Sequence, residues 1–473
     1  MQAITDFKKN IKSEKIYIVT VILIAIFAGF TILNQNPYQW LFIALMPIAY
    51  FLLKFNGVAV FTILISVFFV DWFIQLQLIP DQLGWLPEII IFILIIKALI
   101  LKRATGFVRT PIDIPIVIFL VVALLSIIAN SVNPIRAILA LRLDIKFILM
   151  FYLLVNLNMS EEFYRKIIKI FIILLLIQIP TALIKYQFYG QGEQAIGTYA
   201  AWGGGYSIIL PMVAISLFGS MFIHNKPRIV YILVICGFII FSIIGGKKGL
   251  IYLGPLLLGY IILHISLMKE SRGKIFRSLA IGLLILIMFF PIVMFVPWLT
   301  PALEDFSYLK DFVLIYDVKY SSSGAPIGRI PSTITTFETL TKSPELFLLG
   351  YGPGSMMKSF FKEFDTKELA TRPIDIIYGV TELVLIPIEY GYLGFLIYYL
   401  VPLFLLFKIN LIFYQNIDDI YWKTISFSFS SIIVSYFLIG VIYMAILRSD
   451  LAAFILWFFA ASIYSVGRQR KIF

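Results

Sequence analysis

The chain has 473 residues, of which 61% are hydrophobic and 14% are charged, and its mean hydropathy is +0.98. A soluble globular domain carries about a quarter charged residues, so this composition excludes a water-soluble fold and requires lipid around much of the surface. The net charge of +12 fits basic loops that orient a membrane protein, and no nucleic-acid reader motif accompanies it. Cys236 is the only cysteine, which excludes an intrachain disulfide and a thiolate metal cluster.

Apolar runs of about the length needed to cross a bilayer recur along the sequence. The first follows a basic segment and has no small-residue cleavage site, which favours a transmembrane helix over a signal peptide. We predict an all-α polytopic membrane protein with about 12–14 transmembrane helices, because the fourth run is short and the sixth carries charges. The runs are residues 16–33, 38–54, 57–79, 86–101, 112–131, 135–156, 163–186, 203–223, 229–245, 248–268, 277–297, 383–408, 421–444 and 447–467.

Lysine and arginine clusters indicate how these spans are oriented, because cytoplasmic loops are enriched in both residues. The clusters fall in every second loop, and an even number of spans then places both termini in the cytoplasm. The basic clusters lie at residues 8–15, 102–109, 165–169, 226–228, 269–277, 408–423 and 468–471.

One long external segment remains, residues 298–382, between eleven spans in residues 1–297 and three spans in residues 383–473. The segment is charged and rich in Thr, Ser and Pro, yet it keeps apolar stretches, and a loop of this length is usually functional or disordered. Its apolar content predicts an ordered loop with short helices. Apolar residues share one helical face in residues 355–364, which predicts a helix in the membrane interface.

Lys247 and Lys248 break the orientation rule, because they fall in a tight external turn after Gly245 and Gly246. Glycines allow close backbone approach, and a helix beginning at the lysines would add free N–H groups and a positive dipole end. This combination favours a phosphate cradle. The alternative is a solvated turn whose lysines extend along the membrane surface.

Further external cations lie in the sixth span and in the large loop. Arg136, Arg142 and Lys146 occupy the outer end of that span, where they either face an anion or pair with Asp144 to hold helices together. Arg329 presents a planar fork suited to phosphate oxygens, although a loop arginine can also be simply solvated. Together these cations predict an external anion site, for a polyprenyl-pyrophosphate headgroup or for an ordinary anionic lipid.

Three segments, in this order, resemble the O-antigen polymerase and O-antigen ligase superfamily of GT-C-type membrane glycosyltransferases. Residues 190–199 (GQGEQAIGTY) resemble a short external loop that ends in Gly-Thr-aromatic. Residues 244–250 (IGGKKGL) resemble the Ser-Arg-Gly segment of the family. The third runs from Arg329 through 349–355 (LGYGPGS) to 388–394 (IEYGYLG), and it resembles the family pattern of Arg, helix, Pro, Gly-x-Gly-x-Gly and Glu-x-Gly-x-x-Gly.

The resemblance covers about residues 135–405 and implies a GT-C-like fold with the site beneath the large external loop. It implies a polymerase in which an acceptor sugar hydroxyl attacks the anomeric carbon of a polyprenyl-pyrophosphate-linked (undecaprenyl-type) saccharide. Lys248, at the position that usually holds Arg, and Arg329 would bind the pyrophosphate, with Lys247 assisting. No metal or cofactor is expected, because fixed cations can stabilise the leaving group. The candidate pyrophosphate ligands are Lys247, Lys248, Arg329, Arg142 and Arg136.

The general base is where the sequence departs from the family. The ligases place a His near the start of the span after the large loop, whereas residues 379–383 read Gly-Val-Thr-Glu-Leu. Glu382 is the candidate base closest to that place and Asp375 is the next, although Glu382 could equally pair with a loop lysine. Asp71, within the third span, is either structural or lines a cavity.

This departure favours a polymerase of lipid-linked oligosaccharide repeat units over the ligase that transfers finished glycan to a lipid or protein acceptor. A flippase or another transporter for the same lipid is a weaker alternative, because the sequence shows no two-half repeat. The resemblance implies the bacterial cytoplasmic (inner) membrane. Implied partners are the lipid-linked oligosaccharide, membrane lipid, a flippase and a chain-length regulator, but no nucleic acid.

Overall fold

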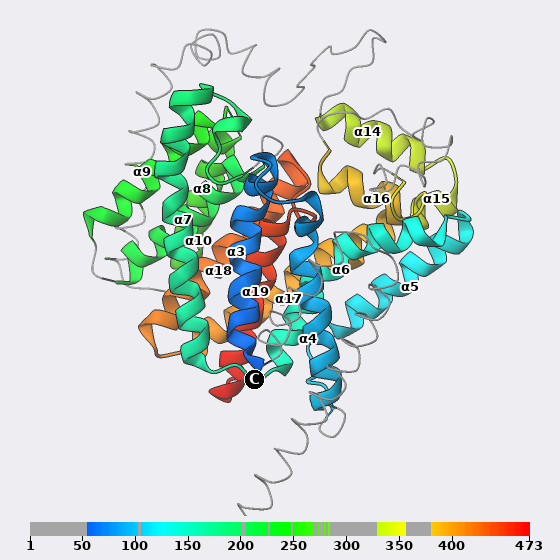
Figure 1. Cartoon of the computed structure of the whole chain (residues 1–473), viewed down its shortest axis with the longest axis horizontal. Coiled ribbons are helices and arrows are strands. Elements are labelled where there is room, and N and C mark those ends of the chain that lie inside the picture. Colours follow the sequence, from blue (N-terminus) through cyan, green and yellow to red (C-terminus); the bar gives the residue numbers. More distant parts are fainter. Residues whose placement is uncertain are drawn as a thin grey trace, which may run out of the picture.

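The computed structural model describes residues 54–102, 106–199, 205–225, 228–246, 249–267, 329–355 and 380–473, with isolated positions between 273 and 283. Within these residues all regular structure is helical, and the helices pack into one bundle (Figure 1). Seven helices in the described part are long enough and apolar enough to cross a membrane. The chain is therefore a helical multi-pass membrane protein, as its composition predicted.

Helices coincide with the predicted spans three to ten and twelve to fourteen. Predicted spans 16–33, 38–54 and 277–297 fall almost entirely outside the described residues. The bounds are α3 (Asn56–Gln75), α4 (Leu86–Lys102), α5 (Asp113–Ala129), α6 (Pro134–Asn156), α7 (Glu161–Tyr189), α8 (Tyr206–His224), α9 (Ile229–Ile244), α10 (Leu250–Leu267), α16 (Glu382–Gly394), α17 (Val401–Asn416), α18 (Ile420–Leu438) and α19 (Asp450–Gln469).

Local sequence signals explain where three of these helices begin. Asn133, Ser160 and Asp419 each accept a hydrogen bond from a backbone N–H in the first turn of α6, α7 and α18, respectively. Such side chains satisfy N–H groups that have no partner within the helix. By contrast, α16 does not end before α17, because a π-helical turn at Phe395–Leu400 joins the two into one apolar segment.

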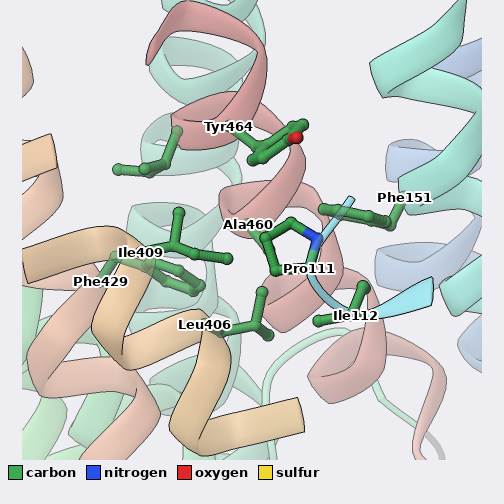
Figure 2. A pocket seen from close by; sticks show the side chains of 9 residues that line it. Pro111, Ile112, Phe151, Leu406, Ile409, Phe429, Ala460 and Tyr464 are labelled. Carbon is green, nitrogen blue, oxygen red and sulfur yellow. The ribbon is translucent and has the colours of Figure 1, made fainter. Parts of the chain in front are cut away.

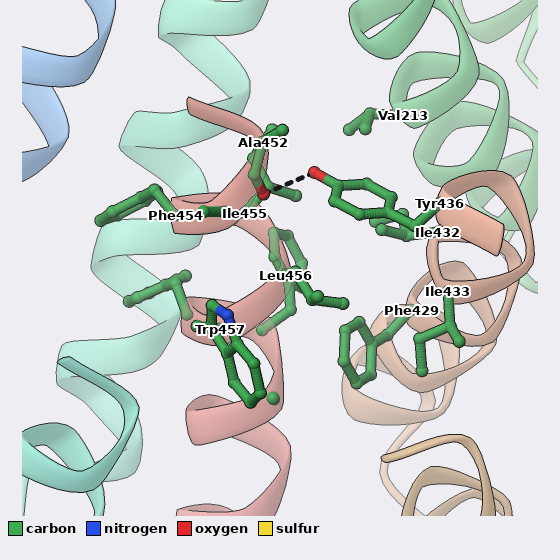
Figure 3. Packing of buried hydrophobic residues seen from close by; sticks show 14 of the residues in the cluster. Val213, Phe429, Ile432, Ile433, Tyr436, Ala452, Phe454, Ile455, Leu456 and Trp457 are labelled. Atoms are coloured by element: carbon green, nitrogen blue, oxygen red, sulfur yellow. Dashed lines mark hydrogen bonds between the residues drawn. The ribbon is translucent and has the colours of Figure 1, made fainter. Parts of the chain in front are cut away.

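Helix α19 lies at the centre of the bundle, with 89% of its span buried, compared with 39% for α3. It packs between α6 and α18, where the Tyr436 hydroxyl donates to the Ala452 carbonyl at 2.6 Å (Figure 3). Serines of α18, including Ser428 and Ser435, donate to carbonyls of their own helix. Because these hydroxyls are satisfied within their own helix, the serines can lie in the apolar interior. Small residues of this kind also let membrane helices approach closely.

Charged residues hold three helix ends together at the end of the bundle that carries the C-terminus. Glu161 at the start of α7 and Asp419 before α18 both pair with Arg165 and Arg470. We call this end of the bundle the terminal end. The opposite end, which carries α14 (Arg329–Leu340) and α15 (Pro344–Leu349), is called the loop end (Figure 1).

A small cavity lies among α6, α17, α18 and α19, next to the residues that precede α5 (Figure 2). Its volume is about 10 Å³, and its lining is almost wholly apolar, with side chains such as Phe151, Leu406 and Phe429. A space of this size holds at most about one water, and an apolar lining offers that water no partners. The cavity is therefore a packing defect and not a candidate site.

Candidate functional site at the loop end

Helices α14 and α15 show that the described part of the predicted external loop is ordered. Ser343 accepts a hydrogen bond from the Leu346 N–H at 3.1 Å, and Pro344 occupies the first position of α15. Both features are typical helix starts. The predicted interfacial helix at 355–364 lies, apart from Ser355, outside the described residues.

The glycine segment after α15 packs directly on the Glu-x-Gly-x-x-Gly segment of α16. The Tyr351 N–H donates to the Ile388 carbonyl at 2.7 Å, and the Gly352 N–H donates to the Glu389 carbonyl at 3.0 Å. Gly391 has a φ of +68°, and a Cβ there would lie 2.1 Å from the Leu348 carbonyl. Only glycine permits this backbone conformation and approach without strain, so the two predicted motif segments form one structural unit.

Helices α5 and α6 hold this unit from beneath. The Ser126 hydroxyl donates to the Leu349 carbonyl at 2.6 Å, and the Asn130 amide donates to the Gly350 carbonyl at 2.9 Å. Arg136, a predicted pyrophosphate ligand, donates from Nε to the Gly354 carbonyl at 3.1 Å. Arg136 therefore lies at the loop end, with its guanidinium bound to the glycine segment.

The other motif segments meet at the same end. The Gly192 N–H donates to the Ile244 carbonyl at 2.9 Å, which joins residues 190–199 to residues 244–250. A Cβ on Gly249 would lie 2.7 Å from the Tyr443 ring, and the Arg329 guanidinium lies 4.0 Å from the centre of the same ring. Tyr443 thus connects the Gly249 segment to Arg329.

Two of the predicted ligands, Lys247 and Lys248, lie outside the described residues. The positions on either side of them, Gly246 and Gly249, are described. Gly249 lies against Tyr443, on whose ring Arg329 stacks, and the Arg329 Nε also donates to the Tyr443 carbonyl. Gly249, the residue that follows Lys248, therefore lies close to Arg329.

Arg448, which the sequence reasoning missed, joins two buried carboxylates. Its guanidinium donates to both carboxylate oxygens of Asp144, at 2.6 and 2.8 Å, and to Glu389 at 2.5 and 3.2 Å. Tyr390 donates a further hydrogen bond to Asp144 at 2.6 Å. Arg448 lies at the outer end of the predicted span 447–467, so the search for cations within spans could have found it.

The charge of Arg448 is maintained by its surroundings. Burial lowers the pKa of Arg448, but the charges of Asp144 and Glu389 outweigh burial and hold the pKa well above its ordinary value. In the described part of the chain, Asp144 pairs with Arg448 and not with the cations of its own helix. The predicted alternative of an ion pair that holds helices together thus applies to Asp144, with a different partner.

Glu382, the predicted base, is 1% exposed. Its Oε1 atom accepts hydrogen bonds from the backbone N–H groups of Ile446 and Leu447, both at 2.8 Å. These bonds hold the turn that leads to Arg448. From the sequence, Glu382 was a candidate base or the partner of a loop lysine, and in the structure its Oε1 atom binds this backbone turn.

A second group of charges lies on the other face of α6, and we call it the mixed-charge cluster. Lys146 is 4% exposed and binds Glu88 at 3.0 Å and Asp450 at 2.5 Å. Burying an ion is costly unless its partners are well placed, and two carboxylates meet this requirement. The cluster consists of Asp71 on α3, Glu88 on α4, Arg142 and Lys146 on α6, and Asp450 on α19.

Arg142 is the member of this cluster with unused hydrogen-bond donors. Its guanidinium stacks on Trp85 at 4.1 Å and lies 3.9 Å from Glu88, beyond hydrogen-bond distance. Its Nε and Nη1 atoms are buried and have no hydrogen-bond partner. A buried donor without a partner costs about 1–3 kcal/mol, so an anion that accepts from Arg142 would recover this cost.

Both histidines of the chain lie towards the terminal end. His224 and Tyr414 are 3.0 Å apart, and His264 and Tyr260 are 2.6 Å apart, among α8, α10, α17 and α18. The loop end therefore has no histidine to act as a base. Within the described residues, no three His, Cys, Asp or Glu side chains form a potential metal site.

Neither a family model nor a curated protein matches the sequence. The class that the fold defines is a helical multi-pass membrane protein.

Proposed function

We propose that the chain is a polymerase that joins polyprenyl-pyrophosphate-linked oligosaccharide repeat units at the outer face of a bacterial cytoplasmic membrane. The observation that carries this proposal is the meeting of the motif segments at the loop end. Residues 190–199 bind 244–250, Arg329 stacks on the tyrosine that Gly249 contacts, and residues 349–355 bind 388–394. Segments that resemble one enzyme superfamily, and that lie far apart in the sequence, thus surround one end of the bundle.

The proposed reaction is a single displacement. The acceptor sugar hydroxyl oxygen forms a bond to the anomeric carbon of the donor saccharide. The bond between that carbon and the pyrophosphate oxygen breaks, its electron pair stays on the pyrophosphate, and the hydroxyl proton passes to a base. The product is a longer glycan on one carrier and a free polyprenyl pyrophosphate.

Cations at the loop end would stabilise the charge that develops on the leaving pyrophosphate. Donors fixed in advance around a developing charge are commonly the largest contribution to catalysis. Lys248 and Arg329 take this role by resemblance, with Lys247 and Arg136 in support. Arg142 has the strongest structural support, because two of its buried donors have no hydrogen-bond partner.

Glu382 is assigned a positioning role in this proposal. Its carboxylate holds the backbone of Ile446 and Leu447, and it is nearly inaccessible to a substrate hydroxyl. A general base must reach the hydroxyl proton directly or through one water.

An O-antigen-type ligase is the second candidate, because the same segments resemble both kinds of enzyme. The position of His224 and His264 towards the terminal end argues against it, since the ligases place a histidine beside the large loop. A flippase for the same lipid is a third candidate. A flippase would supply the donor and a chain-length regulator would act on the product, so both are expected partners.

The test is extension of a native lipid-linked repeat unit by the full chain in liposomes, with Lys248→Ala and Arg329→Ala variants beside it. We expect a ladder of longer products from the wild type and loss of the ladder in both variants. Arg468→Ala is the matched control, because Arg468 is exposed at the terminal end. Transfer only to a separate acceptor would favour the ligase, and movement of intact lipid across the bilayer would favour the flippase.

A further inference from the structure

Asp71 is the only charged residue of α3, and it lies in the part of the helix nearest the loop end. Its side chain is exposed, yet the charged groups with which it interacts, Glu88, Lys146 and Asp450, lie on α4, α6 and α19. Asp71 therefore lies near charged groups of three other helices and keeps an exposed side chain. Ionisable residues within membrane spans usually face a cavity or a pathway and are usually functional.

Glu88 and Asp450, the two carboxylates that interact with Asp71, both bind Lys146. Within the described part of the chain, Asp71 has charged neighbours but makes no hydrogen bond or ion pair. Its carboxylate is therefore free to accept a proton from an incoming group.

A second unused polar group lies on the segment that packs on α3, where the Thr198 hydroxyl donates to the Phe68 carbonyl at 2.6 Å. The Tyr199 side chain is 1% exposed, and its hydroxyl has no hydrogen-bond partner. Its ring is tilted against that of Tyr206, with centroids 4.1 Å apart, and its centroid lies 6.2 Å from that of Phe68, which is three residues before Asp71 on α3. A buried hydroxyl without a partner is costly, and a sugar hydroxyl could act as that partner.

We propose that Asp71 is the catalytic base that removes the proton from the acceptor sugar hydroxyl. This inference rests on the proposed function. The hydroxyl proton passes to the Asp71 carboxylate while the oxygen bonds to the anomeric carbon and the electron pair of the broken bond stays on the pyrophosphate. Arg142, in the same mixed-charge cluster, offers its unused donors to that pyrophosphate, so base and leaving-group site lie in one cluster.

The experiment compares wild type with Asp71→Asn, Asp71→Glu and the control Asp81→Asn, all full-length in liposomes with the native lipid-linked repeat unit. Asp81 is an exposed carboxylate at the same end, in the short helix Asp81–Trp85. Loss of a general base typically lowers kcat by about 100- to 10,000-fold. We expect that loss for Asp71→Asn, partial recovery for Asp71→Glu, and the wild-type rate for Asp81→Asn.

Two further measurements distinguish a base from a structural residue. Binding of polyprenyl pyrophosphate without sugar should be unchanged in Asp71→Asn, since the base does not bind the carrier. The wild-type kcat should rise with pH as a carboxylate loses its proton, and the residual kcat of Asp71→Asn should lack this rise.

Three results would overturn the assignment. Extension by Asp71→Asn at the wild-type rate would exclude Asp71 as the base and leave the polymerase proposal standing. Loss of both extension and carrier binding in Asp71→Asn would make the residue structural. Failure of the wild type to extend the native unit would overturn the proposed function itself, and the base assignment with it.

Discussion

Arg448 binds Asp144 through two parallel hydrogen bonds of 2.6 and 2.8 Å. Two residues further along, Asp450 binds Lys146, which lies two residues after Asp144 on α6. The start of α19 therefore holds α6 on two sides with ion pairs of opposite polarity. This arrangement places the donors of Arg142 and the carboxylates of the mixed-charge cluster at one end of the bundle.

Replacing Arg448 by methionine should destabilise the protein strongly. The change leaves Asp144 and Glu389 buried without their shared cation, and breaking a buried ion pair costs about 3–5 kcal/mol. Thermal unfolding of the purified protein should show a much lower Tm than in Arg468→Met, where the arginine is exposed and belongs to no ion pair in the described part. Adding Asp144→Asn and Glu389→Gln should recover part of the loss, and equal Tm values for the two single variants would contradict this account.

Replacing Gly391 by alanine should separate the two motif segments. The new Cβ would lie 2.1 Å from the Leu348 carbonyl. Residues other than glycine also rarely adopt the φ of +68° found at this position. We expect loss of chain extension together with faster proteolysis of the loop. Gly259→Ala is the control, because a Cβ on this glycine of α10 meets nothing within 4 Å. Equal behaviour of the two variants would argue against a rigid contact between the segments.

Replacing Arg142 by glutamine should weaken binding of polyprenyl pyrophosphate. Hydrogen bonds to charged groups contribute about 1.5–3 kcal/mol, which corresponds to a loss of affinity of about 10- to 150-fold. Equilibrium binding to the full chain in nanodiscs measures this loss, with Arg228→Gln as a control on an exposed arginine before α9. Unchanged affinity in Arg142→Gln would remove Arg142 from the pyrophosphate site.

Replacing Asp419 by asparagine tests the charge network at the terminal end. Burial raises the pKa of Asp419, but the hydrogen bonds and charge of Arg165 outweigh burial and lower the pKa below its ordinary value. A lowered pKa stabilises the fold above the unfolded pKa of about 3.9, and this stabilisation is lost as the pH falls through the folded value.

Asparagine is also a good helix-capping residue, so the variant removes mainly the charge. The Tm of Asp419→Asn should be lower than that of the wild type at pH 7, and the difference should shrink as the pH falls below about 4. A difference that stays constant between pH 7 and pH 3 would show that the charge of Asp419 does not contribute.

The helical membrane class followed from composition and from the length of the apolar runs, because both are properties of the sequence itself. The contact between Gly350 and Gly391 could not be predicted in the same way. Each glycine indicates an unusual backbone, but which backbone approaches it depends on tertiary packing. The order of the motifs along the chain could be read from the sequence and indicated the resemblance. That the motif segments meet at one end of the bundle could be seen only in the structure.

Individual site residues differed in how far the sequence revealed them. Arg142 was recognised because a cation is unexpected within a span, and Arg448 satisfied the same criterion without being recognised. Glu382 was chosen for its place in the sequence, but its oxygen is bound to the backbone of Ile446 and Leu447. Asp71 was assigned either a structural role or a place in a cavity, and the structure adds that its charged neighbours lie on three other helices.

The most direct test of the central claim is the product balance of the wild-type chain acting on its native lipid-linked repeat unit in liposomes. A polymerase releases one polyprenyl pyrophosphate for every new glycosidic bond, so chain growth and carrier release should rise together in equal amounts. Carrier release without longer glycan, or intact lipid appearing in the opposite leaflet without release, would contradict the polymerase.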